Sequence, residues 1–385
     1  MRRPPSAAAS AALGPWARSR LTVRALGLAL PLDVPADVFS TWRIDEGTEL
    51  LLGHLPAGAP ASLLDLGCGY GALGLPVAAR FPEARALLVD RDLLAVAASS
   101  HNARQLGLAN VQVAPGLGLR GLEGSFSWIL CNVPARIGAP FLRHLVGAGP
   151  ALLAPGGELR IVVIRDLEPA LAGIAPAVRG PRHSVYAFPA APGPPAEADD
   201  EALYARDSVD FDGMTLLRPS DASEDPRHRA GLSVLLDALP RTPPSSALVF
   251  RGGYGALPLA LRRRYPAALV TAQERDLLDA AFTRLNARRL GLQIEVAGSL
   301  FLEGRAALVC GESSPGGGEQ VAAFEMKRAS EAILPGGQGL VLFTERQARE
   351  WRSALPKGAS LLVKRDGFAV LRLPPPDRPS PAEGA

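Results

Sequence analysis

A run of glycines between two carboxylates is the part of the sequence best suited to chemistry. Asp65 precedes three alternating glycines, Gly67, Gly69 and Gly71, where a short apolar segment gives way to a helical pattern. Glycines at such a turn let the backbone pass close to a ligand, and the helix N-terminus that follows is electropositive. Asp90 ends the next apolar segment about twenty residues later, where a carboxylate can accept both hydroxyls of a ribose. The pattern predicts a site for a nucleoside-containing cofactor.

The spacing of the glycines separates two classes of cofactor. Dinucleotide sites normally use GxGxxG, whose glycines accommodate a pyrophosphate, whereas this chain has GxGxG with an acid just upstream. A carboxylate beside the turn would repel a pyrophosphate but suits the cationic amine of a methionine moiety. We therefore expect S-adenosyl-L-methionine as the cofactor rather than a nicotinamide dinucleotide, bound by Asp65, Gly67, Gly69, Gly71 and Asp90. A glycine turn without a ligand is the alternative.

The sequence repeats itself at a shift of 184 residues. The segment Ser62–Leu73 aligns with Ser246–Leu257, and Asn102–Arg104 aligns with Asn286–Arg288. Agreement over this length indicates a duplicated domain.

The second copy carries the glycine turn in altered form. Val249 and Arg251 stand where the first copy has Asp65 and Gly67, while Glu274 keeps an acid after the second strand. Losing an acid and crowding the turn with a long side chain predicts a degenerate copy that does not bind the cofactor and serves in packing and substrate handling.

Strands and helices alternate within each half. Continuous apolar segments followed by amphipathic ones are typical of parallel sheets covered on both faces. The fold class expected is therefore α/β, with two tandem Rossmann-like domains and doubly wound, mostly parallel sheets. The elements predicted in the first half are strands at 62–66, 86–89, 128–130 and 159–163 and helices at 72–80 and 93–106.

Composition suggests where the domains begin and end. The Arg-, Ala- and Ser-rich first twenty residues could be a targeting segment, but we favour a disordered leader because the same bias runs through the chain. The Ala-, Pro- and acid-rich composition near Pro189–Asp207 is typical of a linker. The expected division is a leader with possible first strands at 1–36, a cofactor-binding domain at 37–190, a linker at 191–206, a degenerate domain at 207–373 and a disordered tail at 374–385.

Charge and cysteine content restrict the class of protein. A net charge of +3 and a pI of about 8.9 permit a nucleic-acid partner without demanding one. Three widely separated cysteines argue against a disulfide framework and for a reducing compartment such as the cytoplasm. The five histidines show no metal-ligand spacing, and no apolar run approaches the roughly 20 residues that span a bilayer. We expect neither a metal site nor a membrane partner.

The first copy resembles the class I S-adenosylmethionine-dependent methyltransferases, and within them the small methyltransferase domain family, over about residues 37–190. Val38–Ser40 and Ile44–Leu52 are similar to the family's FS…LDxGTxLLL segment, and the match continues through Asp65–Gly71, Asn132–Ala135 and Pro155–Gly157. The family includes duplicated 16S and 23S rRNA guanine-N2 methyltransferases. The resemblance therefore implies two tandem Rossmann-like methyltransferase domains and an N-methyltransferase acting on a guanine N2 in rRNA.

The resemblance also implies a catalytic pair, Asn132 and Pro134. In the family, an Asn-Pro-Pro-aromatic motif lets the Asn side chain and the next carbonyl accept hydrogen bonds from the target amine, which aligns its lone pair with the methyl group. This chain has Val133 in place of the first proline and Ala135 in place of the aromatic. Either the target differs, or another aromatic stacks on the base; the candidates are Phe39, Trp42 and Phe141.

Several alternatives stay open. In the relatives named, the degenerate copy precedes the active one, and here the order is reversed. A small-molecule or protein-amide methyltransferase would use the same Asn-x-Pro geometry, and an inactive RNA-binding pseudoenzyme would need no catalysis. Two basic groups in the second copy could grip phosphates or simply face solvent; they are Arg262–Arg264 and Arg284, Arg288 and Arg289.

Overall fold

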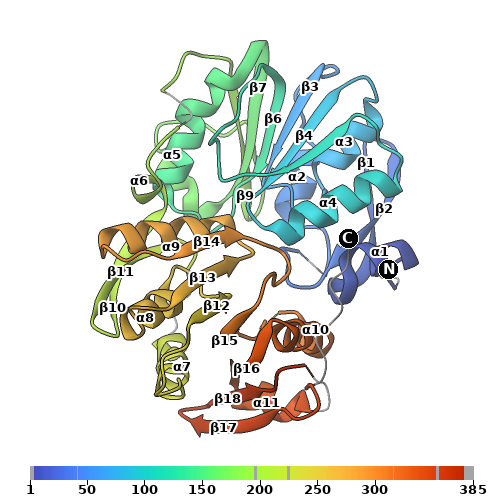
Figure 1. Cartoon of the computed structure of the whole chain (residues 1–385). Coiled ribbons are helices and arrows are strands. Elements are labelled where there is room, and N and C mark those ends of the chain that lie inside the picture. Colours follow the sequence, from blue (N-terminus) through green and yellow to red (C-terminus); the bar gives the residue numbers. More distant parts are fainter. Residues whose placement is uncertain are drawn as a thin grey trace, which may run out of the picture. The chain divides into compact units, whose positions relative to one another are not determined.

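The computed structural model describes residues 4–40, 42–194, 197–222, 226–314, 316–352 and 355–376. The chain divides into two compact units, Met1–Arg206 and Asp207–Ala385, which run from blue to green and from yellow to red in Figure 1. Each unit is built on a seven-stranded sheet with helices packed on it.

The first unit has the strand order β5-β4-β3-β6-β7-β9-β8. Strands β5 to β7 are parallel to one another, and β9 runs antiparallel between β7 and β8. The sheet strands are β3 (Ser62–Leu66), β4 (Arg85–Asp90), β5 (Val111–Pro115), β6 (Phe126–Asn132), β7 (Leu153–Ile164), β8 (Val178–Arg179) and β9 (His183–Pro189). The other elements are α1 (Ala7–Leu13), η1 (Gly14–Trp16), β1 (Ala17–Ala25), β2 (Leu28–Pro35), α2 (Glu46–Leu52), α3 (Gly74–Arg80), α4 (Leu93–Gln105), α5 (Ala139–Ala148), η2 (Gly149–Leu152), η3 (Arg165–Leu171) and α6 (Asp200–Tyr204).

The second unit repeats this arrangement, with the order β14-β13-β12-β15-β16-β18-β17 and a separate hairpin of β10 and β11. Its strands are β10 (Ala205–Phe211), β11 (Met214–Pro219), β12 (Ser246–Phe250), β13 (Leu269–Glu274), β14 (Glu295–Gly298), β15 (Ala306–Glu312), β16 (Ile333–Thr344), β17 (Ser360–Arg365) and β18 (Phe368–Leu373). Its helices are α7 (Pro226–Asp237), α8 (Ala256–Arg264), α9 (Leu277–Arg289), α10 (Gly318–Glu331) and α11 (Glu345–Glu350). The predicted fold class, two tandem α/β domains with mostly parallel sheets, is confirmed.

Burial explains why the central strands read as continuous apolar runs. Every residue of β3 is buried, because α3 packs on β3 and β4, α4 packs on β4 and β5, and α2 packs on β6, β7 and β9. A strand covered on both faces gains from apolar side chains at each position, not at alternate ones. The predicted strand at 62–66 matches β3, and the predicted helix at 93–106 ends one residue beyond α4.

Each unit begins with a β-hairpin tied to the glycine turn by one buried asparagine. The Asn102 Nδ2 group donates to the carbonyl oxygens of Asp33 and Tyr70 at 2.9 Å, and its Oδ1 accepts from the Asp33 N–H at 2.8 Å. Asn286 makes the same three bonds in the second unit, to Leu217 and to the carbonyl of Tyr254. The repeated asparagine noted in the sequence is therefore a clamp between hairpin, helix and turn.

Replacing Asn102 with Ala is expected to destabilise the first unit by about 3 kcal/mol, because it leaves three buried backbone groups without partners. Asn286→Ala should destabilise the second unit by a similar amount. Thermal unfolding followed by calorimetry would measure both. Only Asn102→Ala should also weaken binding of S-adenosylhomocysteine, since only Asn102 supports the turn of the first unit. Unchanged unfolding temperatures in both variants would contradict the clamp.

A charged cluster adds to the clamp in the first unit. The Asp33 carboxylate is fully buried and accepts hydrogen bonds from Ser6, Arg20 and His101. Burial alone would raise the pKa of this carboxyl, but the hydrogen bonds outweigh burial and hold the pKa well below its usual range. The ionised carboxylate thus joins α1, the hairpin and α4.

Two segments differ from expectation. The disordered leader expected for the first twenty residues is wrong from residue 7 on, where α1, η1 and the start of β1 contribute buried side chains to the core. The possible first strands expected within 1–36 are present as β1 and β2. Compositional bias hid the alternating pattern of the hairpin. The segment 191–206, expected as a linker, carries the short helix α6. Its Tyr204 is 2% exposed and stacks on Phe141 of α5, with ring centroids 5.4 Å apart. The tail beyond residue 376 lies outside the described residues.

Candidate functional site

The structure brings the predicted site residues to one edge of the first sheet. The glycine turn follows β3, Asp90 ends β4, and Asn132 ends β6. Strands β3, β4 and β6 are parallel neighbours, so their carboxyl ends lie side by side. The direction of strand succession reverses between β3 and β6, and ligands of open α/β sheets bind in the crevice at such a point.

The glycine turn has a backbone that other residues rarely adopt. Gly67, Gly69 and Gly71 have φ angles of +80°, +56° and +93°. A Cβ on Gly67 or Gly69 would meet no atom within 4 Å, so a ligand can approach the backbone there. A Cβ on Gly71 would lie 2.3 Å from Leu75 Cδ1, so this glycine lets α3 pack against the turn.

The Asp90 carboxylate is joined to the turn. Its Oδ2 accepts from the Gly69 N–H at 2.8 Å, and its Oδ1 accepts from the Asp92 N–H at 2.9 Å. Each carboxylate oxygen can accept a second hydrogen bond. The two backbone bonds therefore orient the carboxylate at the end of β4, where the sequence predicts an acceptor for ribose hydroxyls.

Asp65 lies beneath the turn rather than over it. Its carboxyl is fully buried, and Oδ2 accepts from the Gly74 N–H at 2.8 Å at the start of α3. Oδ1 has no hydrogen-bond partner among the residues that the structure describes. Burial raises its pKa to about 7, opposed by the bond from Gly74 and reinforced by the charge of Asp90. Burial favours the neutral form of this carboxyl, whereas a cation bound in the crevice would favour its ionised form.

Replacing Asp65 with Asn is expected to change how stability depends on pH. The folded carboxyl keeps its proton up to about pH 7, whereas the unfolded chain loses it near pH 4. Between these values the folded state binds more protons, so its stability falls as the pH rises. The Asp65→Asn side chain has no proton to lose, so the variant should unfold a few degrees above the wild type at pH 8 and at nearly the same temperature at pH 4. Each kcal/mol of stability shifts the unfolding temperature by about 2–4 °C.

Calorimetry from pH 4 to pH 8 would measure this difference, with the exposed Asp166→Asn as the matched control. Parallel profiles for wild type and Asp65→Asn would show that the carboxyl is not buried as described.

Asn132 is held by the start of α2. Its Nδ2 group donates to Asp45 Oδ2 at 2.8 Å and to Thr48 Oγ1 at 3.0 Å. No hydrogen bond to its Oδ1 occurs within the described part of the chain. Pro134 is exposed, and its carbonyl accepts from the Ile137 N–H at 3.1 Å, which closes the turn after β6. Asn132 thus presents an acceptor, and Pro134 shapes the loop beside it.

The three aromatic candidates for stacking on a base differ in exposure. Phe141 is 4% exposed and packs on Tyr204, so it belongs to the core. Phe39 and Trp42 are 70% and 54% exposed. The Arg18 guanidinium lies 4.1 Å from the Trp42 ring centroid. Only Phe39 and Trp42 can offer a ring face to a ligand.

The turn of the second unit carries two charged side chains with partners of their own. Arg251, at the position of Gly67, has a φ of +52° and an ion pair with Glu325 at 3.2 Å. Glu274 is 2% exposed and accepts from the Gly252 N–H at 2.7 Å. Burial raises the pKa of Glu274 well above its usual value, so this carboxyl is a packed internal group and not an open acceptor.

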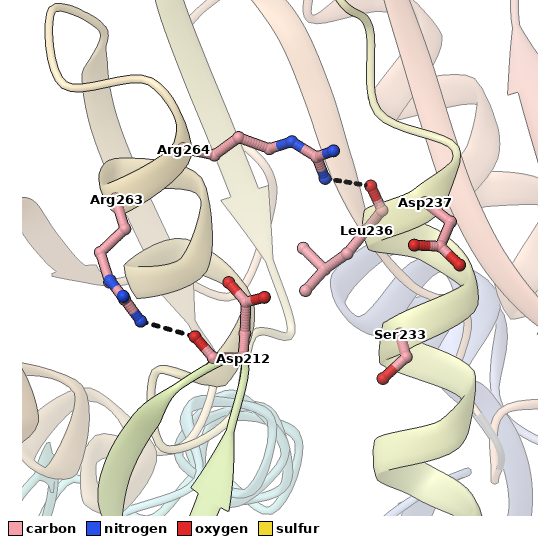
Figure 2. Close-up of a pocket in the computed structure, with 6 residues that line it drawn as sticks. All are labelled: Asp212, Ser233, Leu236, Asp237, Arg263 and Arg264. Atoms are coloured by element: carbon pink, nitrogen blue, oxygen red, sulfur yellow. Dashed lines mark hydrogen bonds between the residues drawn. The ribbon is translucent and has the colours of Figure 1, made fainter.

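The basic groups of the second unit are largely engaged with its backbone. Arg262, Arg263, Arg264 and Arg284 each donate to a main-chain carbonyl. Figure 2 shows Arg263 and Arg264 at a pocket of about 500 Å³, where they donate to the Asp212 and Leu236 carbonyls. The side chains of Asp212, Ser233 and Asp237 complete its lining. Two carboxylates beside two guanidinium groups do not make an anion site.

Other predicted features can be placed briefly. Cys68 and Cys131 are buried, and burial raises the pKa of both thiols, so neither is a nucleophile. Among the described residues, no three His, Cys, Asp or Glu side chains are grouped so as to hold a metal ion. Within the same residues, no helix is both long enough and apolar enough to cross a bilayer.

Sequence reasoning missed two residues of the site, Asp45 and Thr48. They lie in the segment that carries the family resemblance, but nothing in their spacing shows that they contact Asn132, 87 and 84 positions away. The contact depends on how α2 packs on β6 and β7.

Comparison with solved structures supports the fold of the whole chain. A T. thermophilus 16S rRNA guanine N2 methyltransferase, solved in complex with AdoMet and guanosine, superposes with a TM-score of 0.67 at 20% identity and covers 94% of this chain and 100% of its own. At this identity the match establishes the architecture of both units.

Sequence comparison finds relatives over about a third of the chain. A ribosomal RNA small subunit methyltransferase C of Pseudomonas entomophila is 38% identical over 129 residues, which is 32% of this chain and 39% of that protein. A ribosomal RNA large subunit methyltransferase G of Alcanivorax borkumensis is 36% identical over 143 residues, 35% of this chain and 37% of its own. The matches thus span about two fifths of these relatives. Residues 30–174, which lie within the first unit, match the family model of the methyltransferase small domain.

Proposed function

We propose that the protein is an S-adenosylmethionine-dependent N-methyltransferase that acts on a guanine N2 in rRNA. The observation that carries this proposal is the Asn132 side chain, whose amide nitrogen is bound by Asp45 and Thr48 and whose oxygen is left to accept. It stands at the end of β6, beside the open glycine turn of β3. The relatives named above are rRNA methyltransferases.

The crevice fits S-adenosylmethionine in three respects. The turn at Gly67 and Gly69 is open to a ligand, Asp90 stands at the end of β4 as an acceptor for the ribose hydroxyls, and the buried Asp65 carboxyl would ionise beside a cationic ligand. The sulfonium of the cofactor supplies an electrophilic methyl group that needs no further activation. The residues named hold and orient; none of them has to act as a nucleophile.

Asn132 would direct the target amine. Its Oδ1 accepts a hydrogen bond from one N–H of the amine, which fixes the direction of the nitrogen lone pair. The same oxygen stabilises positive charge as the nitrogen forms its new bond, and a proton leaves the nitrogen for solvent. Positioning and this dipole are the contributions that the chain itself makes to the reaction.

An exposed aromatic pair could replace the stacking residue that Ala135 cannot supply. Trp42 lies three positions before Asp45, so the chain between them spans at most about 11 Å. Arg18 over one face of Trp42 adds positive charge beside the ring. A base turned out of structured RNA would stack on Trp42 or Phe39 while its amine reaches Asn132.

Transfer of a labelled methyl group tests the proposal. The purified full-length chain is incubated with labelled cofactor and one candidate substrate in each reaction. The substrates are deproteinised rRNA, ribosomal subunits, a protein extract and a small-molecule extract. Label in rRNA that digests to N2-methylguanosine supports the proposal. Label only in protein or small molecules would favour the alternative methyltransferases, and no label with intact cofactor binding would indicate a pseudoenzyme. The proposed compartment is the cytoplasm, where the three buried cysteines stay reduced.

A further inference from the structure

We infer that Asp45 is a positioning residue for the target amine, acting with Thr48 through Asn132. The inference rests on the proposed function, because it assumes that the Asn132 oxygen receives an amine. Asp45 would then have two roles: it caps α2, and it fixes which end of the Asn132 amide faces the crevice.

The chemistry of Asp45 decides that orientation. An ionised carboxylate can only accept hydrogen bonds, so the end of the amide that faces it must be the NH2 group. The bond from Asn132 Nδ2 to Asp45 Oδ2 is 2.8 Å long, and Thr48 Oγ1 accepts from the same nitrogen at 3.0 Å. Because both amide hydrogens are engaged, Asn132 Oδ1 is left as an acceptor. Rotating the amide group by 180° would place Oδ1 against the Asp45 carboxylate, where two acceptors would face each other.

The start of α2 holds the carboxylate in place. Asp45 is the N-cap residue, and the Gly47 and Thr48 N–H groups donate to its Oδ2 at 2.9 and 3.3 Å. Gly47 permits the close approach: a Cβ there would lie 2.8 Å from Asp45 Oδ2 and 3.2 Å from Asn132 Oδ1. Asp45 is thus preorganised before any substrate binds.

The second unit provides an internal comparison. Glu312 occupies the register position of Asn132, since it pairs with Leu342 of β16 as Asn132 pairs with Val162 of β7. Glu312 binds His228 at 2.9 Å. At the repeat shift, Arg229 and Leu232 stand at the positions of Asp45 and Thr48. The copy that has Arg251 in place of Gly67 therefore also lacks the carboxylate and hydroxyl that orient an amide.

Substitutions separate helix capping from orientation. Asp45→Ala removes both, whereas Asp45→Ser keeps a good N-cap but is too short to reach Asn132 as the carboxylate does. Asp45→Asn retains an acceptor oxygen and should restore part of the activity. Thr48→Val removes the hydroxyl at nearly constant shape. Asp276→Ala is the matched control, because Asp276 caps α9 of the second unit through the Leu278 N–H.

Kinetics on rRNA give the first readout. We expect kcat to fall about 10- to 100-fold in Asp45→Ala and Asp45→Ser, since misplacing a reacting group costs factors of this size. Thr48→Val should lower kcat less, and the affinity for S-adenosylhomocysteine should stay within about twofold in every variant. Asp276→Ala should keep the wild-type kcat. Wild-type kcat in Asp45→Ser, or the same fall in Asp276→Ala, would overturn the inference.

A second readout does not need activity. In the amide spectrum of ¹⁵N-labelled protein, the Asn132 side-chain NH2 pair is assigned by its absence in Asn132→Ala. It should shift in Asp45→Ala and Asp45→Ser and stay in place in Asp276→Ala. An unshifted pair would overturn the inference even if the chain methylates rRNA. If the wild type transfers no methyl group to rRNA, the proposed function fails, while this spectrum still decides whether Asp45 orients the amide.

Discussion

Replacing Asn132 with Ala is expected to lower kcat for methyl transfer at least about 100-fold, with little change in cofactor affinity. The variant loses the oxygen that aligns the amine and stabilises its developing charge, and removal of one such preorganised group typically costs factors of 100 to 1,000. The glycine turn after β3 and Asp90 at the end of β4 keep their own hydrogen bonds in this variant. Single-turnover transfer of a labelled methyl group and calorimetry with S-adenosylhomocysteine would measure the two quantities.

Asn110→Ala is the matched control for this experiment. Asn110 lies in the same unit and donates to the carbonyls of Ala78, Phe81 and Ala84, so its loss should lower stability without lowering kcat of the folded enzyme. If Asn132→Ala transferred methyl groups as fast as Asn110→Ala, Asn132 would have no part in catalysis and the proposed mechanism would have to be given up.

Asp90→Ala is expected to weaken binding of S-adenosylhomocysteine by at least about 100-fold from a wild-type Kd in the micromolar range, as an order of magnitude. Hydrogen bonds to a charged group contribute about 1.5–3 kcal/mol each, and the carboxylate would accept two from a ribose. The substitution also removes the acceptor that holds the Gly69 N–H. Calorimetry of the full-length chain should show one site in the wild type.

The second copy offers the control for Asp90. Glu274 stands at the equivalent position, but it is buried against its own turn. Glu274→Gln should therefore leave both the affinity and the stoichiometry unchanged. Two binding sites in the wild type, or loss of binding in Glu274→Gln, would show that the second crevice also takes the cofactor.

The sequence was informative where chemistry depends on the order of elements along the chain. The carboxyl ends of neighbouring parallel strands lie at one edge of a sheet. The sequence alone therefore predicts that the glycine turn and Asp90 lie close together. The contact between Asp90 and Gly69 follows from that topology. The assignment of these residues to a cofactor stays a prediction that the binding experiments address.

Contacts that depend on packing could not be predicted. The repeat revealed Asn102 and Asn286 but not that each clamps a hairpin, because the hairpin of the first unit was hidden by its composition. Asp65 was expected to face the ligand and instead lies under the turn, since its direction depends on how α3 begins. Phe141 was a candidate for stacking and belongs to the core, where Tyr204 from the supposed linker covers it.

The duplicated clamp has a consequence for how the two halves could diverge. Asn286 and Thr283 hold the second turn as Asn102 and Ser99 hold the first, although Arg251 stands in that turn where the first has Gly67. The side chains that secure the architecture are therefore not those that would recognise a small molecule. After a gene duplication, one copy can therefore lose its ligand-recognising residues one at a time and still fold. Such a copy can persist as a stable domain that binds no cofactor.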